Sequence, residues 1–323
     1  IDGKYINSFS EGKPIFRTGL NYQLAEATYV RGSWGQGYRF PSMAELFIKT
    51  EIASSIWVYP NPNLRPENGW SAELGIKQGI KFGNWMGYLD IATFLMQYDD
   101  MMEFSFGQWE ENIVDTNVTP HVSTNFGGKG FKSINVGKTQ ISGVELSVSG
   151  QGEITNNITM NILAGYTYMN PISLNPEAVY AYGVLHGDTM TDGSILDQSI
   201  TYTNSSSDSS LLKYRYEHIA KIDAELIYKK LSLGGSLRYN NFMRNIDAIF
   251  ASEEFSALVP GINEARESGK DGDIIIDARL GYQFNNTIRF GFVVNNLLNR
   301  EYMTRPATMM PPRTFAFQCN LKI

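Results

Sequence analysis

The chain has 323 residues, 42% of them hydrophobic, a formal net charge of −6 and a single cysteine, Cys319. The acidic balance argues against nucleic acid as a partner, because binding to phosphates needs a basic surface, and one cysteine excludes a disulfide framework. No apolar run reaches the ~18 residues of a spanning helix, whereas a membrane β-barrel would also have a low mean hydropathy, here −0.24.

Alternation of apolar and polar side chains predicts an all-β protein of about eleven antiparallel strands. In chain order, the predicted strands cover residues 16–24, 28–34, 72–77, 87–98, 144–149, 159–168, 221–228, 232–240, 274–284, 288–294 and 314–323. Short links lie near 25–27, 81–86, 150–156, 229–231 and 284–287. Long links lie near 38–69, 105–132, 170–212, 248–272 and 299–312. A short helix is expected within the third long link, over residues 176–184.

The strict alternation of short and long links predicts an antiparallel transmembrane β-barrel, because such barrels have tight turns at one end and long loops at the other. A soluble β-sandwich is the alternative, and it predicts extraction without detergent. Aromatic residues near the strand ends fit the two interfacial girdles of a barrel. They are Trp34 and Trp70 near the long links, and Trp85, Tyr228, Tyr282 and Phe284 near the short ones.

Charged residues occur in the middle of the predicted strands, at the positions that alternate with apolar ones. An Arg or Lys at the midplane of lipid would cost about 2–4 kcal/mol, so these residues are expected to point inward. The residues predicted to line a lumen or to contact a plug are Arg31, Glu73, Lys77, Glu145, Arg238 and Arg279.

The stretch SWGQGYRFPSMAELF, residues 33–47, ends one of the predicted strands. Gly35 and Gly37 are predicted to let the chain leave the sheet there, with φ values that other residues resist. Pro41 is expected to hold Phe40 in an extended conformation. The strand is therefore expected to stop before the Tyr-Arg-Phe-Pro segment.

A short helix is predicted over residues 43–48, directly after this proline. Ser42 is expected to cap it, with Glu45 completing a capping box. Arg39 is expected to pair with Glu45 or Glu67, which would hold a long loop at the rim of the sheet.

Four segments, in this order, resemble the motifs of TonB-dependent outer-membrane receptors. They are GQGYRFPSMAELF (35–47), NPNLRPENGWSAELGIK (61–77), ISGVELSVSG (141–150) and VVNNLLNREYMTRPATMMPPRTFAFQCNLKI (293–323). Together they extend from the first predicted strands to the end of the chain, and the order of the segments is more specific than any one of them.

The resemblance implies active import of a scarce, bulky solute across the outer membrane of a Gram-negative bacterium. The implied partners are the transported small ligand, outer-membrane lipid and lipopolysaccharide, a plug domain of the same protein, and the TonB complex, reached through an N-terminal segment. Residues 1–323 are expected to be the C-terminal half of the barrel, without the plug and the first strands, because a barrel of about 22 strands would need roughly 650 residues. No cofactor is expected.

The resemblance leaves the ligand open among siderophore–iron, a vitamin, haem and a glycan. Residues of the predicted outer loops that are expected to contact it are Arg39, Trp57, Tyr59, Trp109, His121 and His186. Packing of the loops is the alternative role for the aromatic residues. Some haem importers of the family place a histidine between the segments that here contain Pro41 and Asn61. This chain has none there, which argues against haem, although Tyr59 could serve as an oxygen ligand.

No catalytic motif of the Gly-x-Ser-x-Gly, His-Glu-x-x-His or phosphate-loop type occurs, so the protein is expected not to be an enzyme. The acid pairs Asp99–Asp100 and Glu110–Glu111 are expected to be solvated loop charges, and no metal site is predicted. Two alternatives stay open. One is a passive or adhesive outer-membrane β-barrel without energy coupling, and the other is an outer-membrane hydrolase.

Overall fold

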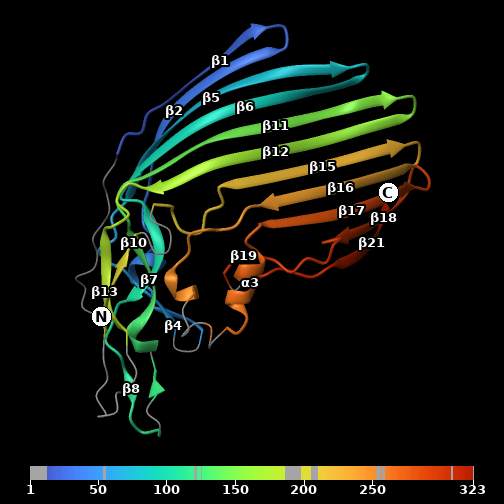
Figure 1. The fold of residues 1–323 in the computed structure, drawn as a ribbon. Coiled ribbons are helices and arrows are strands. Elements are labelled where there is room, and N and C mark those ends of the chain that lie inside the picture. The colour runs from blue at the N-terminus through green and yellow to red at the C-terminus, as the bar shows by residue number, and fades with distance from the viewer. Residues whose placement is uncertain are drawn as a thin grey trace.

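A computed structural model describes residues 13–53, 56–119, 122–124, 126–185, 198–204, 210–251, 256, 259–306 and 308–322. Its main element is an antiparallel sheet of 11 strands in the order β1-β2-β5-β6-β11-β12-β15-β16-β17-β18-β21 (Figure 1). Each predicted strand corresponds to one strand of this sheet, so the all-β prediction is confirmed. Among the described residues the sheet stays open, with β1 and β21 at its two edges.

The strands of the large sheet are longer than most of the predicted ones. Their bounds are β1 (Arg17–Ala25), β2 (Thr28–Arg39), β5 (Glu67–Phe82), β6 (Trp85–Asp99), β11 (Thr139–Thr155), β12 (Ile158–Ser173), β15 (His218–Tyr228), β16 (Leu231–Asn240), β17 (Asp273–Gln283), β18 (Ile288–Asn295) and β21 (Thr314–Leu321). Tight turns join them in pairs at one end, and three of these turns contain a residue with positive φ, at Gly83, Asn157 and Lys229. The short links are thus where the sequence predicts them.

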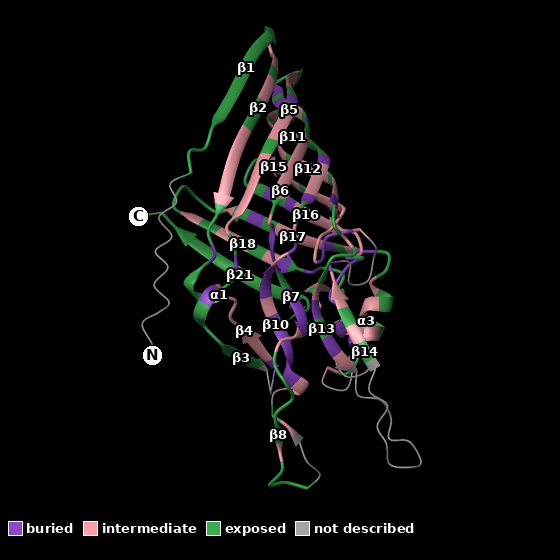
Figure 2. Cartoon of the chain, turned by 90° about the vertical axis from the view of Figure 1, so that its left-hand side faces the viewer, coloured by how far each residue is buried: buried purple, intermediate pink, exposed green. Residues whose placement is uncertain are grey.

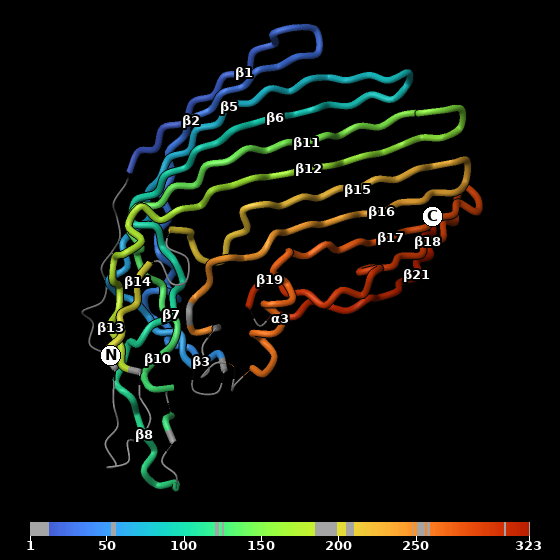
Figure 3. Tube along the Cα trace, in the orientation of Figure 1, coloured from blue at the N-terminus to red at the C-terminus, as the bar shows by residue number. Residues whose placement is uncertain are grey.

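The long connections carry the remaining elements, which gather at the opposite end of the sheet (Figure 3). Their bounds are α1 (Met43–Phe47), β3 (Thr50–Ala53), β4 (Ile56–Tyr59), β7 (Met102–Gln108), β8 (Val114–Asp115), β9 (Val122–Ser123), η1 (Phe126–Gly128), β10 (Lys129–Asn135), β13 (Val179–Leu185), β14 (Gln198–Thr203), η2 (Ala248–Ala251), α3 (Ile262–Ser268), β19 (Met303–Arg305) and β20 (Thr308–Met309). Four of them form a second sheet in the order β3-β4-β10-β7. We call this assembly of long connections the loop body.

The buried apolar side chains belong mainly to the loop body, not to the large sheet (Figure 2). Its largest hydrophobic cluster consists of Ile56, Phe106, Phe131, Ile249 and Ile262, which come from three different connections. In contrast, β1 and β21 are exposed along their whole length. The loop body is therefore held together by its own core, whereas most large apolar side chains of the large sheet stay at least partly exposed among the described residues.

The strand register separates the side chains of the large sheet into two faces, because directly opposed residues share a face. One row runs Val30–Ile76–Ile91–Leu146–Tyr166 across five strands. The neighbouring row runs Arg31–Gly75–Ala92–Glu145–Thr167 on the other face. Extended over all strands, the same register places the aromatic residues predicted for the girdles on the apolar face: Trp34, Trp70, Trp85, Tyr228 and Tyr282.

The prediction that Gly35 and Gly37 end the strand is wrong. β2 continues to Arg39, and both glycines stay paired with β5, Gly37 directly opposite Gly69. Neither has a positive φ. Side-chain space explains at least part of the glycine content, since a Cβ on Gly69 would lie 2.7 Å from the Tyr98 ring.

The prediction for the helix at Ser42 is confirmed, and the prediction for residues 176–184 is wrong. Ser42 accepts a hydrogen bond from the Glu45 N–H, and Glu45 accepts one from the Ser42 N–H, which is a capping box. Residues 179–185 form strand β13, in which Tyr180 is half-buried against the Trp109 and Tyr202 rings, whereas Tyr182 is exposed. Pairing with β14 and packing on β7 outweigh the helix propensity of the two alanines.

Within the described part of the chain, none of the helices has both the length and the apolar character needed to cross a membrane.

Candidate functional site

One face of the large sheet carries its charged side chains, and we call it the charged face. The register places all six predicted lumen residues on it, together with further charged residues of the same sheet. Twelve charged residues of this face are Arg31, Glu73, Lys77, Asp90, Glu145, Lys221, Asp223, Glu225, Arg238, Asp277, Arg279 and Arg289.

Arg31 reaches two strands across this face to bind an acid. Its guanidinium lies 2.8 Å from Glu73 and donates to both oxygens of Asp90 at 2.8 Å. The side chain passes over Gly75 of the strand between, where a Cβ would lie 2.7 Å from Cζ of Arg31. Glycine at this position therefore makes room for the arginine, a reason for the residue that sequence analysis did not identify.

Arg279 repeats the arrangement on the other half of the sheet. It pairs with Asp223 through two hydrogen bonds of 2.6 and 2.7 Å. Its path crosses Gly234, where a Cβ would lie 2.5 Å from Nε of Arg279. Two guanidinium–carboxylate pairs, each spanning a glycine, thus connect β2 to β6 and β17 to β15.

Further ion pairs neutralise most of the remaining charges. Arg238 lies 3.3 Å from Asp277, and Arg289 lies 3.8 Å from Glu225. Lys77 lies over the Tyr88 ring at 4.3 Å. Glu145, in contrast, is exposed and has no hydrogen bond or ion pair among the described residues.

The charged face is hollow, as the inner side of a curved sheet should be. Near the tight turns it forms a hollow of ≈ 1070 Å³, which Tyr29, Tyr88, Asn161 and Asp223 help to line. A second hollow of ≈ 590 Å³ adjoins it around Arg31. Polar groups therefore line a cavity wall in the middle of the sheet, where the opposite face is apolar.

Arg39 lies at the rim, where β2 passes into the loop body. Its guanidinium is 3.7 Å from Glu45 and 3.9 Å from Glu67, so it contacts both predicted partners. Burial opposes ionisation of Glu45, but hydrogen bonds from Ser42 and the charge of Arg39 outweigh it and lower the pKa of this carboxyl. Arg39 is 51% exposed, so part of its guanidinium still faces solvent.

Three of the predicted ligand residues lie in one cluster of the loop body. Lys49 Nζ lies over the rings of Trp57, at 5.2 Å, and Tyr59, at 4.7 Å. Both oxygens of Glu110 accept hydrogen bonds from the same ammonium at 2.8 Å. Tyr59 is buried, its hydroxyl has no partner among the described residues, and burial with the nearby Glu110 charge raises its pKa to about 12.

Trp109 adds a second lysine to this cluster. Lys132 Nζ lies over the Trp109 ring at 4.9 Å, and the indole N–H donates to the Gly130 carbonyl at 3.0 Å. Burial lowers the pKa of Lys132, which has no ion pair among the described residues. We call Lys49, Trp57, Tyr59, Trp109, Glu110 and Lys132 the lysine–aromatic cluster. It combines partly desolvated positive charge with aromatic surface.

The two predicted histidines, His121 and His186, lie outside the described residues. No group of three or more His, Cys, Asp or Glu side chains is placed to hold a metal ion in the portion of the chain that the structure describes.

A buried polar network joins three connections of the loop body, and sequence analysis missed it. Lys213 is fully buried and donates to Asp247 at 2.7 Å and to Ser105 at 2.9 Å. Tyr214 donates to the other oxygen of Asp247 at 2.5 Å. The partners are 33–108 residues apart in the chain, and no local motif signals such a contact.

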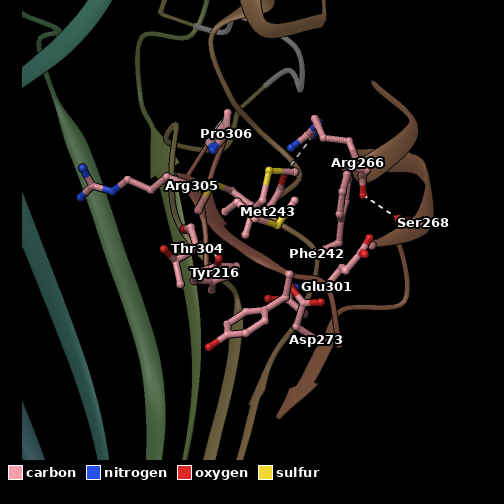
Figure 4. Close-up of a pocket in the computed structure, with 16 residues that line it drawn as sticks. Tyr216, Phe242, Met243, Arg266, Ser268, Asp273, Glu301, Thr304, Arg305 and Pro306 are labelled. Carbon is pink, nitrogen blue, oxygen red and sulfur yellow. Dashed lines mark hydrogen bonds between the residues drawn. The ribbon is translucent and has the colours of Figure 1, made fainter. Parts of the chain in front are cut away.

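A small pocket of ≈ 90 Å³ lies between the connection that contains α3 and the one that contains β19 (Figure 4). Tyr216, from the connection between β12 and β15, also lines this pocket and donates to the Thr304 carbonyl at 3.0 Å. Arg266 covers the Phe242 ring at 4.6 Å and donates to the Met243 carbonyl at 3.2 Å. The Tyr216 contact joins the β12–β15 connection to the last connection, whereas the Arg266 contacts lie within the connection that contains α3.

Comparison with known proteins gives a family. The family model described as "TonB dependent receptor-like, beta-barrel" matches residues 2–297. A search of curated proteins gave no match.

Solved structures of similar fold cover nearly the whole chain. The ferric-catecholate import receptor Fiu from E. coli K12 has 21% identity and a TM-score of 0.55, over 94% of this chain and 34% of its own. A double mutant of the Serratia marcescens hemophore receptor HasR, in complex with its hemophore HasA and heme, has 16% identity and a TM-score of 0.55, over 95% of this chain and 39% of its own. The pyoverdine outer membrane receptor FpvA from Pseudomonas aeruginosa PAO1 has 16% identity and a TM-score of 0.52, over 96% of this chain and 36% of its own. At these identities the likeness shows the fold alone, and the chain spans 34–39% of the length of these three structures.

Proposed function

The chain belongs to the TonB-dependent receptor family of Gram-negative outer-membrane β-barrels, and from this premise we propose that it is part of a transporter that imports a scarce, bulky solute. In this proposal the large sheet is the C-terminal half of the barrel. The plug domain and the segment that contacts TonB belong to parts of the protein outside residues 1–323. Energy for import comes through TonB.

The segregation of charge to one face of the large sheet is the observation that carries this proposal. Lipid contact is favourable for the apolar face, which is exposed along strands such as β1 and β21. The charged face would line the passage, and its arginines pair mostly with acids of the same wall. Because the charges of the wall are paired with one another, it offers a polar surface from which a charged solute can still be released.

We further propose that the solute is an anionic chelate with aromatic or conjugated groups, such as an iron–siderophore complex. Lys132 offers a positive charge without a carboxylate partner among the described residues, next to the Trp109 ring. Lys49, which is paired with Glu110, lies over the Trp57 ring and adds aromatic surface beside it. Fiu is a ferric-catecholate import receptor and FpvA is a pyoverdine receptor, which places their solutes in the same class.

Growth on defined solutes tests the proposal. A strain that lacks the full-length gene should lose growth on one iron, vitamin, haem or glycan source and regain it with the gene restored. Growth should also be lost in a strain without TonB. Growth that survives loss of TonB would instead indicate a passive barrel, and growth unaffected by deletion on every source would contradict import.

A further inference from the structure

Tyr180 extends the lysine–aromatic cluster toward the interior of the loop body. Its ring lies 6.0 Å from the Trp109 ring, centroid to centroid, and the two planes are 19° apart. Nearly parallel, offset rings at such a distance attract each other. Trp109 follows β7 in the connection between β6 and β11, whereas Tyr180 belongs to β13 in the connection between β12 and β15. The stacked pair therefore joins two connections of the loop body.

The Tyr180 side chain is held by three contacts of different kinds. Its hydroxyl donates to the Phe106 carbonyl at 2.7 Å, so the tip of the side chain is bound to β7. Its ring stacks on Tyr202 at 6.3 Å, and Lys213 Nζ lies over it at 5.3 Å. Lys213 is itself fully buried and pairs with Asp247 at 2.7 Å, so this cation–π contact has a fixed partner. The Tyr180 ring is therefore a rigid surface.

Trp109 has fewer contacts that fix its plane. The indole N–H donates to the Gly130 carbonyl at 3.0 Å, which holds one atom of the ring and leaves its tilt about that point free. Gly107 leaves space for the ring, since a Cβ there would lie 2.8 Å from Cζ2 of Trp109. Lys132 Nζ, at 4.9 Å, ends a flexible side chain that can follow the ring. Tyr180 is therefore the flat, rigid neighbour that sets the tilt of the indole.

We propose that Tyr180 is a positioning residue of the solute site, which holds the Trp109 indole in the tilt that lets an aromatic ring of the solute stack on it beside the Lys132 ammonium; this inference rests on the proposed import function. Trp109 is half-buried, so part of its ring stays accessible for such stacking. The ammonium attracts any anionic solute, whereas the fixed indole favours one that carries an aromatic ring. Tyr180 therefore acts on the preference between aromatic and non-aromatic anions more than on the attraction of anions as such.

The first test follows the Trp109 ring directly, without a solute. The full-length protein in detergent carries 5-fluorotryptophan, and the signal of residue 109 is the one that Trp109→Phe removes from the fluorine NMR spectrum. Tyr180→Leu should move this signal at least halfway toward that of free 5-fluorotryptophan, because the indole then samples several tilts. Tyr180→Phe keeps the ring and should move it less than half as far. Tyr182→Leu, the same change at a 75% exposed residue of the same strand, should leave it in place.

The other tryptophan signals report whether the variants are folded. If Tyr180→Leu changes all of them, Tyr180→Met takes its place, because methionine also removes the ring but fills more of its length. A Trp109 signal that stays in place in the folded variant would overturn the inference.

The second test measures the preference between two anionic iron complexes, a ferric tris-catecholate and ferric citrate, by equilibrium dialysis with the same protein. Wild type should bind the catecholate complex at least fivefold more tightly. Tyr180→Leu should reduce this ratio at least threefold and change citrate binding less than twofold, a result that a smaller folded fraction could not produce. Lys132→Met should weaken the binding of both complexes.

An unchanged ratio in Tyr180→Leu, or no preference in wild type, would overturn the inference. None of these readouts depends on transport, so a growth result against import remains distinguishable.

Discussion

Replacing Gly75 by alanine tests the role of glycine in the charged face. Its matched control is Gly165→Ala, at a mid-strand glycine of the same face. A glycine inside a strand is usually less stable than alanine by roughly 0.5–1 kcal/mol. Without further contacts, both substitutions should therefore stabilise the protein slightly.

The structure predicts opposite signs for the two variants. The new Cβ at position 75 would lie 2.7 Å from Cζ of Arg31, so the guanidinium must move away from Asp90. Exposed ion pairs contribute about 0.2–1 kcal/mol, and hydrogen bonds to charged groups about 1.5–3 kcal/mol. Arg31 and Asp90 are 35% and 22% exposed, so a loss of about 1–2 kcal/mol is expected after discounting for solvent. At position 165 the nearest atom is 3.9 Å away, and nothing has to move.

Gly75→Ala should therefore lower the free energy of unfolding by about 1 kcal/mol, and Gly165→Ala should raise it by about 0.5 kcal/mol. Urea unfolding of the full-length barrel in lipid vesicles, followed by tryptophan fluorescence, measures both values. Gly75→Ala combined with Arg31→Met should recover most of the loss. Equal stability of the two alanine variants would refute the conclusion that Gly75 makes room for Arg31.

Other predictions concern the loop body. Lys213→Met leaves Asp247 buried without its cation, so amide hydrogen exchange in β7 should accelerate as expected for a loss of about 3–5 kcal/mol of stability. The double variant Lys213→Met with Asp247→Leu should restore most of the protection. Unchanged exchange in the single variant would contradict the stabilising role of the pair. Tyr59→Phe removes a buried hydroxyl that has no partner among the described residues, so thermal stability should stay equal or rise, and a marked loss would show a partner for this group. Because the pKa of Glu45 is lowered, the stability that its ionised carboxylate gives to the capping box is complete above the ordinary pKa and is lost as the pH falls through the lowered value. Proteolysis near α1 should therefore increase only in that acidic range. Ser42→Ala should remove this pH dependence. Lys132→Met should reduce solute uptake at least tenfold if the lysine–aromatic cluster binds an anionic chelate, whereas Lys13→Met, the same change at an exposed position before β1, should not.

The strands of the large sheet were predictable because one of their faces is uniformly apolar. Alternation with a period of two predicts both the strand and which of its side chains share the apolar face. In β11, Val144, Leu146 and Val148 lie on the apolar face and Glu145 lies on the other. Residues 87–98 have apolar residues on both faces, so sequence alone could not assign Asp90; its register with β5 and β11 does. The alternation of short and long links then fixes which end of the sheet carries the loop body.

The partners of the charged residues were not predictable, because they depend on register between strands far apart in the chain. Arg279 and Asp223 are 56 residues apart, and Lys213 and Ser105 are 108 apart. Gly35 and Gly37 were predicted to end a strand, but they lie within a paired one. The prediction failed because sequence alone cannot distinguish a glycine that is needed for its φ from one that leaves space for side chains across the sheet.

The most direct test of the two-faced sheet is a spin-label scan along β15 in the full-length protein, with Cys319 replaced by serine and the protein in lipid vesicles. Labels at Ile222, Ala224 and Leu226 should be accessible to oxygen dissolved in lipid, and labels at Lys221, Asp223 and Glu225 to a water-soluble nickel chelate. A period of two in the ratio of the accessibilities is the predicted result. Equal accessibility at successive positions, or the chelate reaching both sets, would contradict a sheet that separates lipid from a polar passage.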